Sequence, residues 1–422
     1  MDTKVGEAYK LARKKYEEYS INTDEVIEKI INIPISIHSW QLDDVIGFEN
    51  ENAELPSGGV ISIGNYPGRC RNIDEYRMDL EKVLSLVPGS KKKIGLQSIE
   101  GDYKGKLKDR NDISKEHFDS WIHWAKANKV GLDMSPSFYS HKYVKDGYTL
   151  ASKDKFIRHY WIEYGKKNRE IASYIGEKMQ IPCISNLWIP DGSKDITPSR
   201  NEHREILKES LDEIYEKKYP KETLMDCVES KLFGIGSEFY NVGSIEFYIA
   251  YAMSKRIGLT LDTGHFHPTE VASDKISSLL PFLDNIFLHL SRGLHWDSDH
   301  VTTLNEELIA IMQEIVRANA FDKVHIGTDY FDATINRVGA LSLGARAVSK
   351  ALFIAMLEPV KMIKEAEDKG DYFSRLAYLE DLKFMPFGAI WAQYCEVANV
   401  PNDFEWIKEV LKYEREVLVN RK

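Results

Sequence analysis

The chain has 422 residues, a formal net charge of −10 and 43% hydrophobic residues, so it is long enough for a large α/β domain with an extension. Its Lys and Arg residues are dispersed, which argues against a nucleic-acid surface, and no apolar run reaches the length of a membrane span. The charged start predicts an amphipathic helix and no signal peptide, and the four cysteines lack CxxC spacing, so we expect a cytoplasmic protein without disulfides or a thiolate metal site.

Buried apolar runs alternate with helical stretches along most of the chain. Strands alternating with helices indicate a parallel sheet, and eight such units predict an α/β fold closed into a (β/α)₈ TIM barrel. A doubly wound open sheet is the alternative, but the GxGxxG fingerprint is missing after the first strand. The predicted strands are Ile33–Trp40, Lys93–Ile99, Val130–Ser135, Ile181–Trp188, Met225–Lys231, Ile257–Asp262, Asn285–Leu290 and Lys323–Asp329. The predicted helices between them include Asp74–Leu86, Lys155–Met179, Ser244–Lys255 and Asn305–Ala318.

Two segments lie outside this repeat. The glycine-rich stretch Pro56–Gly68 is too long for a plain turn, and it is either a mobile lid or a surface loop. From Gly339 onward the sequence is helical again, with a breaker near Gly370. We therefore assign residues 1–340 to a barrel domain that includes the N-terminal helix. Residues 341–422 are assigned to a helical extension, which we expect to be an oligomer arm.

The stretch Ile257–Glu270, IGLTLDTGHFHPTE, is the richest in chemistry. Apolar residues alternate along it and predict a buried strand that ends at Asp262. His265 and His267 follow, before Pro268–Glu270 opens a predicted helix. An aspartate and two histidines just past a strand end suit Mn²⁺, Zn²⁺ or Co²⁺, although Asp262 could instead cap a turn beside two ordinary loop histidines.

Polar residues at the other strand ends extend this set, because the carboxyl ends of barrel strands converge on one mouth. In the fifth strand Glu229 and Lys231 share a face, and in the eighth Asp329 and Phe331 do so. Such clustered carboxylates would repel one another unless cations neutralised them, so we predict two divalent metal sites. The seven candidate ligands are Glu229, Asp262, His265, His289, Asp297, Asp299 and Asp329. Lys231 is either a salt-bridged core lysine or a residue that positions or protonates a substrate oxygen.

Several long motifs resemble the L-rhamnose isomerase family. The resemblance runs from residue 39 to residue 337 and rests on SWQLDDVIGFE, GNYPGR, LWIPDGSKDIT, ESKLFGIGSE, LDTGHFHPTEV, SRGLHWDSDHV and HIGTDYFDATINR. It implies a (β/α)₈ barrel with a C-terminal helical extension, a homotetramer, and two divalent sites per subunit, for which we expect Mn²⁺, with Zn²⁺, Co²⁺ or Mg²⁺ as alternatives. The implied reaction is the reversible conversion of L-rhamnose to L-rhamnulose by hydrogen transfer between C1 and C2. Another divalent-metal barrel isomerase or epimerase with a shifted aldose preference, or a non-catalytic sugar-binding protein, are the rival interpretations.

The resemblance also implies a role for each matching residue. The set holding a structural metal is Glu229, Asp262, His289 and Asp329, and the looser set holding a catalytic metal is His265, Asp297 and Asp299. Lys231, Asp297 and Asp299 are the implied catalytic residues, with Lys231 contacting the substrate. Trp188 resembles the aromatic wall of the sugar site, and Phe331 resembles part of the pocket for the methyl group of the sugar.

Gln97 departs from the family pattern, in which the second strand ends in a histidine that contacts the sugar. A glutamine donates and accepts hydrogen bonds but does not titrate near neutral pH. If that position helps to open the sugar ring by proton transfer, the step is impaired in this chain or is handled by water. We therefore expect Gln97 to bind the substrate and to influence the preference among similar aldoses.

Overall fold

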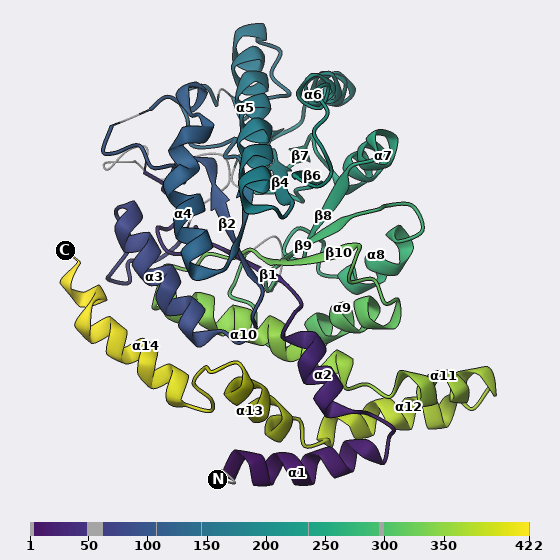
Figure 1. The fold of residues 1–422 in the computed structure, drawn as a ribbon. Coiled ribbons are helices and arrows are strands. Elements are labelled where there is room, and N and C mark those ends of the chain that lie inside the picture. The colour runs from purple at the N-terminus through teal and green to yellow at the C-terminus, as the bar shows by residue number, and fades with distance from the viewer. Residues whose placement is uncertain are drawn as a thin grey trace.

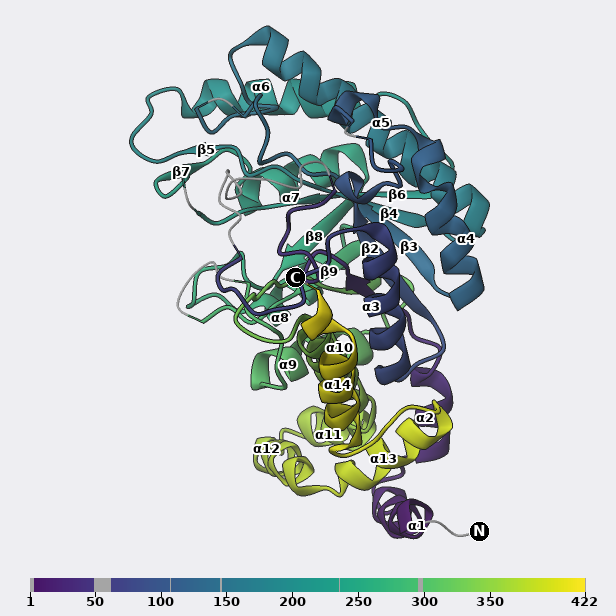
Figure 2. The ribbon, with the colours of Figure 1, turned by 90° about the vertical axis from the view of Figure 1, so that its left-hand side faces the viewer.

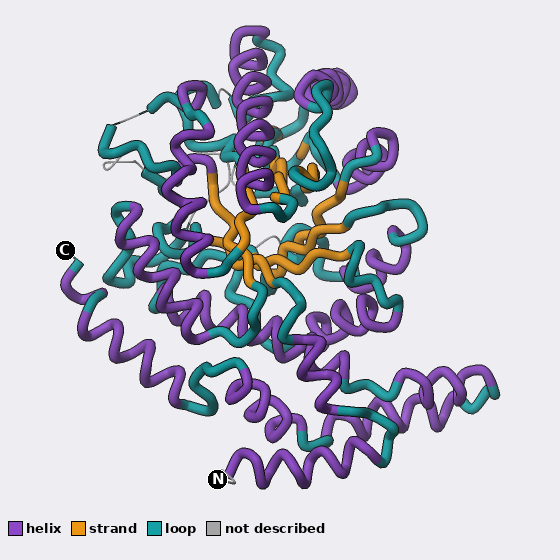
Figure 3. Tube along the Cα trace, viewed as in Figure 1, coloured by secondary structure: helices purple, strands orange, loops and turns teal. Residues whose placement is uncertain are grey.

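A closed barrel of eight parallel strands forms the centre of the molecule (Figure 3). The computed structural model describes residues 4–48, 62–106, 108–144, 146–234, 236–294 and 299–421. Around the barrel the strand order is β1-β10-β9-β8-β6-β4-β3-β2, so the predicted barrel is confirmed and the open sheet is excluded. The barrel strands are β1 (Ile35–His38), β2 (Lys92–Gln97), β3 (Gly131–Ser135), β4 (Cys183–Trp188), β6 (Leu224–Glu229), β8 (Gly258–Asp262), β9 (Ile286–Leu290) and β10 (Val324–Thr328).

Both faces of the barrel strands are buried, one inside the barrel and the other beneath the helices. Every residue of β8 and β9 is buried, which is why their sequences are nearly continuous apolar runs. Each predicted strand lies within two residues of the observed one at either end. The largest difference is in β1, where the predicted strand continued to Trp40. There the chain turns at the rim instead, because the amide of Leu42 donates to the carbonyl of Ser39.

One helix follows each barrel strand and covers the outside of the sheet (Figure 1). Several begin at an Asn or Asp whose side chain accepts from amides of the first turn, as Asn72 does before α3 and Asp154 before α5. The barrel helices are α3 (Ile73–Leu86), α4 (Asp119–Asn128), α5 (Lys155–Met179), α6 (Arg200–Ile214), α7 (Ile245–Lys255), α8 (Ala272–Leu279), α9 (Glu306–Arg317) and α10 (Arg337–Met356). Short 3₁₀ helices lie at Ser98–Glu100, Arg110–Asp112, Lys115–Phe118, Leu382–Phe384 and Leu418–Asn420.

The helix predicted to open at Pro268–Glu270 begins later, at Ala272. Residues 267–270 form a turn instead, in which the amide of Glu270 donates to the carbonyl of His267 at 2.8 Å. The exposed His267 ring bonds to the hydroxyl of Thr269 at 2.8 Å. The turn therefore takes up the residues that were expected to start the helix.

The remaining helices form a layer on one side of the barrel, where α1 and α11–α14 lie together (Figure 2). They are α1 (Lys4–Glu17), α2 (Thr23–Ile30), α11 (Val360–Asp368), α12 (Tyr372–Asp381), α13 (Phe387–Val397) and α14 (Glu405–Glu416). Ion pairs anchor the chain end to α3, with Lys82 2.7 Å from Glu409 and Arg421 2.6 Å from Asp79. The boundary expected between residues 340 and 341 falls inside α10, and the division into two domains stays a prediction.

Helix α10 is long and apolar enough to cross a membrane, and it is the one helix of which this is true within the described residues. Of its apolar window, 78% is buried inside the protein. Its buried residues include Val348, Leu352 and Phe353, and it packs against α3 and α9. Helix α10 is thus the core helix that joins the barrel to the C-terminal layer.

The segment Pro56–Gly68 is described only in part, since residues 56–61 lie outside the described residues. From residue 62 onward it lies against the C-terminal part of the chain. The amide of Tyr66 donates to the carbonyl of Ala333 at 2.8 Å, and the Tyr66 hydroxyl donates to Glu414 at 2.9 Å.

Candidate metal centre

Strand register brings the predicted site residues to one end of the barrel. Trp188 pairs with Glu229 across β4 and β6, and Asp262 pairs with His289 across β8 and β9. Gln97 is likewise the last residue of its strand. The expected convergence of strand ends on one mouth is therefore the observed arrangement.

A first group of ligand atoms comes from four neighbouring strands. One ligand atom from each of Glu229, Asp262, His289 and Asp329 lies within 4.8 Å of the others. The Nδ1 atom of His289 is 3.1 Å from Glu229 Oε2, 3.1 Å from Asp329 Oδ2 and 3.9 Å from Asp262 Oδ2. Three carboxylates around one imidazole nitrogen form a cage of the size and chemistry that a divalent cation takes.

A second group adjoins the first and shares Asp262 with it. It consists of Asp262, His265 and Asp299, again with ligand atoms within 4.8 Å of one another. His265 Nδ1 is 3.2 Å from Glu229 Oε1 and 3.9 Å from Asp262 Oδ2. Asp262 thus belongs to both groups of candidate ligands. Asp297, which was expected in this second set, lies outside the described residues.

Gly264 permits the tight turn that carries His265 into the site. The Gly264 amide donates to Asp262 Oδ1 at 2.7 Å. A Cβ atom at this position would lie 2.7 Å from Asp299 Oδ1 and 2.8 Å from Ser291 Oγ, closer than van der Waals contact permits. Only glycine allows the three segments to approach one another here.

The pKa shifts of the clustered carboxylates and histidines show that their charges must be balanced. Burial would raise the pKa of Glu229, but the imidazoles of His289 and His265 outweigh burial and bring the pKa well below its ordinary value. Burial opposes protonation of His289, but Glu229 and Asp329 raise its pKa well above the ordinary value. Burial, opposed by His265 and reinforced by Asp299, raises the pKa of Asp262. The cluster must therefore hold protons or cations.

The residues present fit a metal. Asp262 Oδ2 is buried and accepts no hydrogen bond from the described residues, although it faces two imidazole nitrogens at 3.9 Å. A buried carboxylate oxygen left in this way costs free energy unless a cation occupies the position in front of it. Carboxylate and imidazole together suit Mn²⁺, Zn²⁺ or Co²⁺.

Residues behind the ligands, which the sequence did not single out, hold them in place. Asn186 Nδ2 donates to Glu229 Oε2, and Thr260 Oγ1 donates to Asn186 Oδ1 at 2.6 Å. Trp40 Nε1 donates to Asp329 Oδ1 at 2.8 Å. Asn186 and Thr260 could have been found from strand alternation, since each lies two residues before a predicted site residue.

His38, on β1, forms hydrogen bonds to residues at the end of β10, the strand with which β1 pairs. Its Nδ1 atom bonds to Thr328 Oγ1 at 2.9 Å, and its Nε2 atom bonds to the carbonyl of Tyr330. Burial lowers the pKa of His38 to about 4, so the ring is neutral. It fixes the chain on either side of Asp329.

The metal groups open into a pocket of about 520 Å³. Trp188 stacks on the His265 ring with centroids 6.0 Å apart, and Lys231 Nζ lies 5.0 Å from the centroid of Trp188. Trp188 also belongs to an aromatic and aliphatic wall of this pocket, formed by Trp40, Val45, Tyr139, Trp188 and Phe331. The predicted substrate residues Gln97, Trp188, Lys231 and Phe331 all line this one pocket. Tyr139 and Val45 come from loops without periodicity, so nothing in the sequence pattern indicated them.

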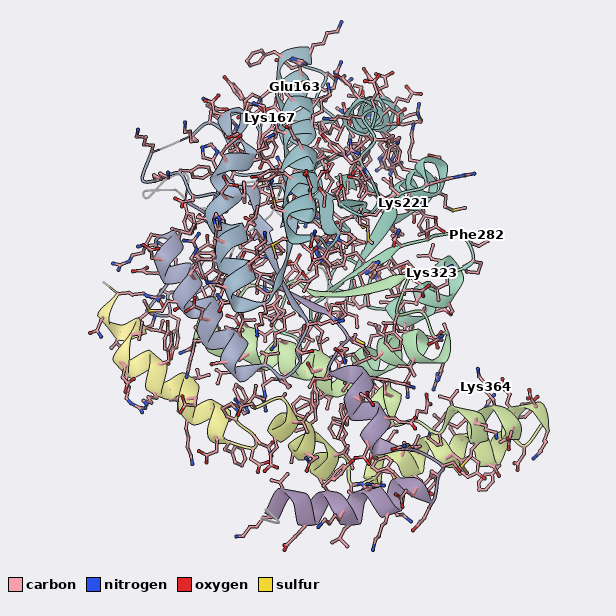
Figure 4. The ribbon with its side chains drawn as sticks, in the orientation of Figure 1. Glu163, Lys167, Lys221, Phe282, Lys323 and Lys364 are labelled. Carbon is pink, nitrogen blue, oxygen red and sulfur yellow. The ribbon has the colours of Figure 1, made fainter. Side chains whose placement is uncertain are left out.

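Among the described residues, one more group of acidic and histidine side chains has the spacing of metal ligands, but it is exposed and paired with a lysine. His159, Glu163 and Glu213 lie on exposed faces of α5 and α6, with Glu163 labelled in Figure 4. Lys166 is 2.8 Å from Glu163 and 2.7 Å from Glu213, so these exposed carboxylates already share a lysine as their ion-pair partner. The group has no need of a cation.

The fold and the site define a (β/α)₈-barrel protein with two adjoining groups of carboxylates and histidines, suited to binding metal, at the carboxyl ends of its strands. The family model described as L-rhamnose isomerase (RhaA) matches residues 3–421. The chain is 47% identical over 417 residues to an L-rhamnose isomerase of Rhodopirellula baltica, covering 99% of this chain and 97% of the relative. It is 47% identical over 421 residues to an L-rhamnose isomerase of Enterobacter sp. (strain 638), covering 100% of both.

The chain therefore belongs to the L-rhamnose isomerase family. Among solved structures, an L-ribulose 3-epimerase is similar with a TM-score of 0.46 at 12% identity, covering 78% of this chain and 96% of that one.

Proposed function

We propose that the chain is a metal-dependent aldose–ketose isomerase that reversibly converts L-rhamnose to L-rhamnulose. Membership of the family supports the reaction class. The observation that carries the proposal is the juxtaposition of the two ligand groups, which share Asp262, with Lys231 and Trp188 in one pocket. Such a pocket holds a polyhydroxylated ligand by its oxygens at one end and by an aromatic face at the other.

We assign the first metal position to Glu229, Asp262, His289 and Asp329. The second position is assigned to Asp262, His265 and Asp299, with Asp297 completing it. Bound divalent cations, which we propose to be Mn²⁺, would supply Lewis-acid stabilisation of the oxygens on C1 and C2. Zn²⁺, Co²⁺ or Mg²⁺ are the alternatives.

The remaining residues bind and orient the sugar. Trp188 covers an apolar face of the ring, and Phe331 contacts the methyl group. Lys231, 6% exposed and held over Trp188, donates to a sugar oxygen near the reacting carbons. Asp299 or Asp297 accepts the one proton that leaves the C2 hydroxyl as it becomes a carbonyl, and a proton is returned to the C1 oxygen as it becomes a hydroxyl, so the reaction is balanced.

We further propose that the protein is a cytoplasmic homotetramer. Helix α12 has no buried residue, and it exposes Phe373 at 82% and Leu376 at 66%. Helix α12 forms a hairpin with α11. This hairpin, marked in Figure 4 by Lys364 of α11, extends from the molecule. Apolar side chains exposed to this degree on one helix are typical of surfaces that another subunit covers.

A sugar screen tests the function. Purified protein with added Mn²⁺ is assayed for ketose formation from L-rhamnose, L-mannose, L-lyxose and D-allose. We expect the highest kcat/KM on L-rhamnose, because the wall containing Phe331 suits a methyl group. A preference for another aldose identifies a different sugar isomerase, and ketose formation from none of the four contradicts the proposal.

A metal assay accompanies the screen. We expect a chelator to abolish activity and Mn²⁺ or Co²⁺ to restore it, with about two metals per chain by elemental analysis, as two adjoining ligand groups require. An active sample that contains no transition metal or magnesium would contradict a metal-dependent mechanism.

A further inference from the structure

Gln97 is engaged with a tyrosine of the same pocket. Its Nε2 atom donates to the hydroxyl oxygen of Tyr139 at 2.6 Å, and its Oε1 atom accepts from Ser137 Oγ at 3.4 Å. Gln97 and Tyr139 are 6% and 3% exposed, and both line the pocket that contains the metal groups. The Gln97 amide is therefore oriented with a donor toward Tyr139 and its acceptor toward Ser137.

The loop that carries Tyr139 is fixed from behind. Arg110, itself 1% exposed, donates from Nη1 to the carbonyls of Ser137 at 2.5 Å and Tyr139 at 2.6 Å. Its Nη2 atom donates to the carbonyl of Ser140 at 3.3 Å. The Tyr139 ring also packs edge-on against Trp188, with centroids 5.8 Å apart. The hydroxyl is thus held in place before any ligand arrives, which lowers the entropy cost of using it.

The hydrogen-bond inventory of Tyr139 indicates what the hydroxyl can do. A phenol has one hydrogen to donate and lone pairs to accept with. Because the oxygen accepts from Gln97, the hydroxyl hydrogen is directed elsewhere. Burial, opposed by Ser137 and Arg110, raises the pKa of Tyr139 well above its ordinary value, so the hydrogen is present at every working pH.

We propose that Tyr139 is a substrate-binding residue that donates a hydrogen bond to a sugar oxygen away from the reacting carbons. Gln97 is its positioning residue and acts through the Tyr139 hydroxyl. This inference rests on the proposed function, because it takes the occupant of the pocket to be an aldose. The polar contact with the sugar at this wall of the pocket is then made by Tyr139, in the loop after β3, and not by Gln97, at the end of β2.

The experiment compares four variants of the Mn²⁺-loaded protein with the wild type. Tyr139→Phe deletes only the hydroxyl, and Gln97→Met replaces the amide with a side chain of similar length. The third variant combines the two. Tyr251→Phe is the matched control, because Tyr251 is also buried and its hydroxyl donates to Asp212 at 3.0 Å on the outer helices. L-Rhamnose binding is measured through tryptophan fluorescence, and ketose formation, metal content and Tm are measured in parallel.

We expect Tyr139→Phe to raise the dissociation constant and the KM for L-rhamnose by about tenfold, with kcat within about twofold of the wild type. Gln97→Met should raise both by about threefold, and the double variant should bind no more weakly than Tyr139→Phe alone, because the two groups act in series. Tm and metal content should stay unchanged, and the control should bind as the wild type does.

Two results would overturn the inference. If Tyr139→Phe binds the sugar as tightly as the wild type does, Tyr139 makes no contact with the sugar. If the losses of binding affinity in the double variant are additive, Gln97 does not act through Tyr139. Failure of the proposed function is seen separately, as sugar binding by the wild type without ketose formation. Absence of sugar binding by the wild type overturns both.

Discussion

In each of Asp262, Asp329 and Glu229, one carboxylate oxygen accepts a hydrogen bond from the protein. Asp262 Oδ1 accepts from the Gly264 amide, Asp329 Oδ1 from Trp40, and Glu229 Oε2 from Asn186. In each residue the other oxygen faces the imidazoles of His265 or His289. In Asp262 and Asp329 one oxygen is thus held by the protein while the other stays directed at the metal position. In Glu229 the oxygen held by Asn186 also faces His289, and Oε1 faces His265. A carboxylate held in this way loses little entropy when it binds a cation.

Gln97→His tests proton transfer separately from the positioning role of Gln97: if the histidine of the family pattern helps to open the sugar ring, this variant should raise kcat on L-rhamnose by about tenfold or more, since a group that titrates near neutral pH fits proton transfer. Gln97 is buried, so the introduced imidazole should titrate somewhat below its usual pH of about 6.5. The measurement is kcat over a pH series for both proteins. Superimposable profiles would show that this position only hydrogen bonds.

Asp191, in the loop after β4, carries a prediction about pH. Burial raises its pKa from 3.8 to about 6, against hydrogen bonds from Thr149 and Ala151 that lower it. The folded state therefore favours the protonated carboxyl. This contribution to the free energy of unfolding is complete below pH ~4 and is lost as the pH rises through ~6. Because Asn does not titrate, the loss of unfolding free energy caused by Asp191→Asn should be larger at pH 4.5 than at pH 7.5, by about 2 kcal/mol. Chemical denaturation between pH 4.5 and 7.5 measures this difference, and a loss independent of pH would contradict it.

Among the elements, strand ends and loops contribute ligands of different rigidity. Asp329 directly follows β10, whereas Asp299 lies in the loop after β9. We predict that Asp329→Ala lowers the Tm of the Mn²⁺-loaded protein by about 5 °C and abolishes activity, because a tightly bound metal stabilises the native state. Asp299→Ala should abolish activity with little change in Tm. Calorimetry with added Mn²⁺ tests this, and equal losses of Tm in both variants would refute the difference between the two sites.

Three adjacent strands also share a buried relay that fixes one ligand. Thr260 on β8 orients the amide of Asn186 on β4, which in turn holds Glu229 on β6. Thr260→Val removes the hydroxyl at nearly constant volume and leaves the amide free to turn its oxygen toward the carboxylate. We expect the affinity for Mn²⁺ to fall about tenfold, measured by competition with a chelator. Thr23→Val, a buried hydroxyl on α2 bonded to Tyr9, is the control. Equal affinity in the two variants would show that the relay has no effect on the metal.

For the whole molecule, the exposed face of α12 carries the prediction of assembly. We expect Phe373→Lys to lower the mass measured by light scattering below that of a tetramer, because a charge at an 82% exposed apolar position would have to be desolvated in an interface. Phe156→Lys, on α5 and 63% exposed, is the matched control and should keep the wild-type mass. A tetramer in both variants would place the interface elsewhere.

The sequence by itself determined the barrel and most of its chemical residues. Eight short buried apolar runs, separated by helical stretches, allow few other folds, because buried parallel strands need helices on their outer face. Strand parity placed Glu229, Asp262, His289 and Asp329 near the ends of their strands, and the rule that these ends converge brought them to one mouth. Both inferences are local in the chain, which is why a single sequence carries them. The roles of these residues remain predictions.

Only the tertiary structure decided how the residues combine. That Asp262 is shared by the two ligand groups depends on the register between β8 and β9 and on the turn at Gly264, and no local pattern encodes that register. Asn186, Trp40 and Tyr139 enter the site through contacts with residues 43, 289 and 42 positions away in the chain. Packing between distant segments fixes such contacts, because side-chain volume and hydrogen-bond geometry must be satisfied in three dimensions at once.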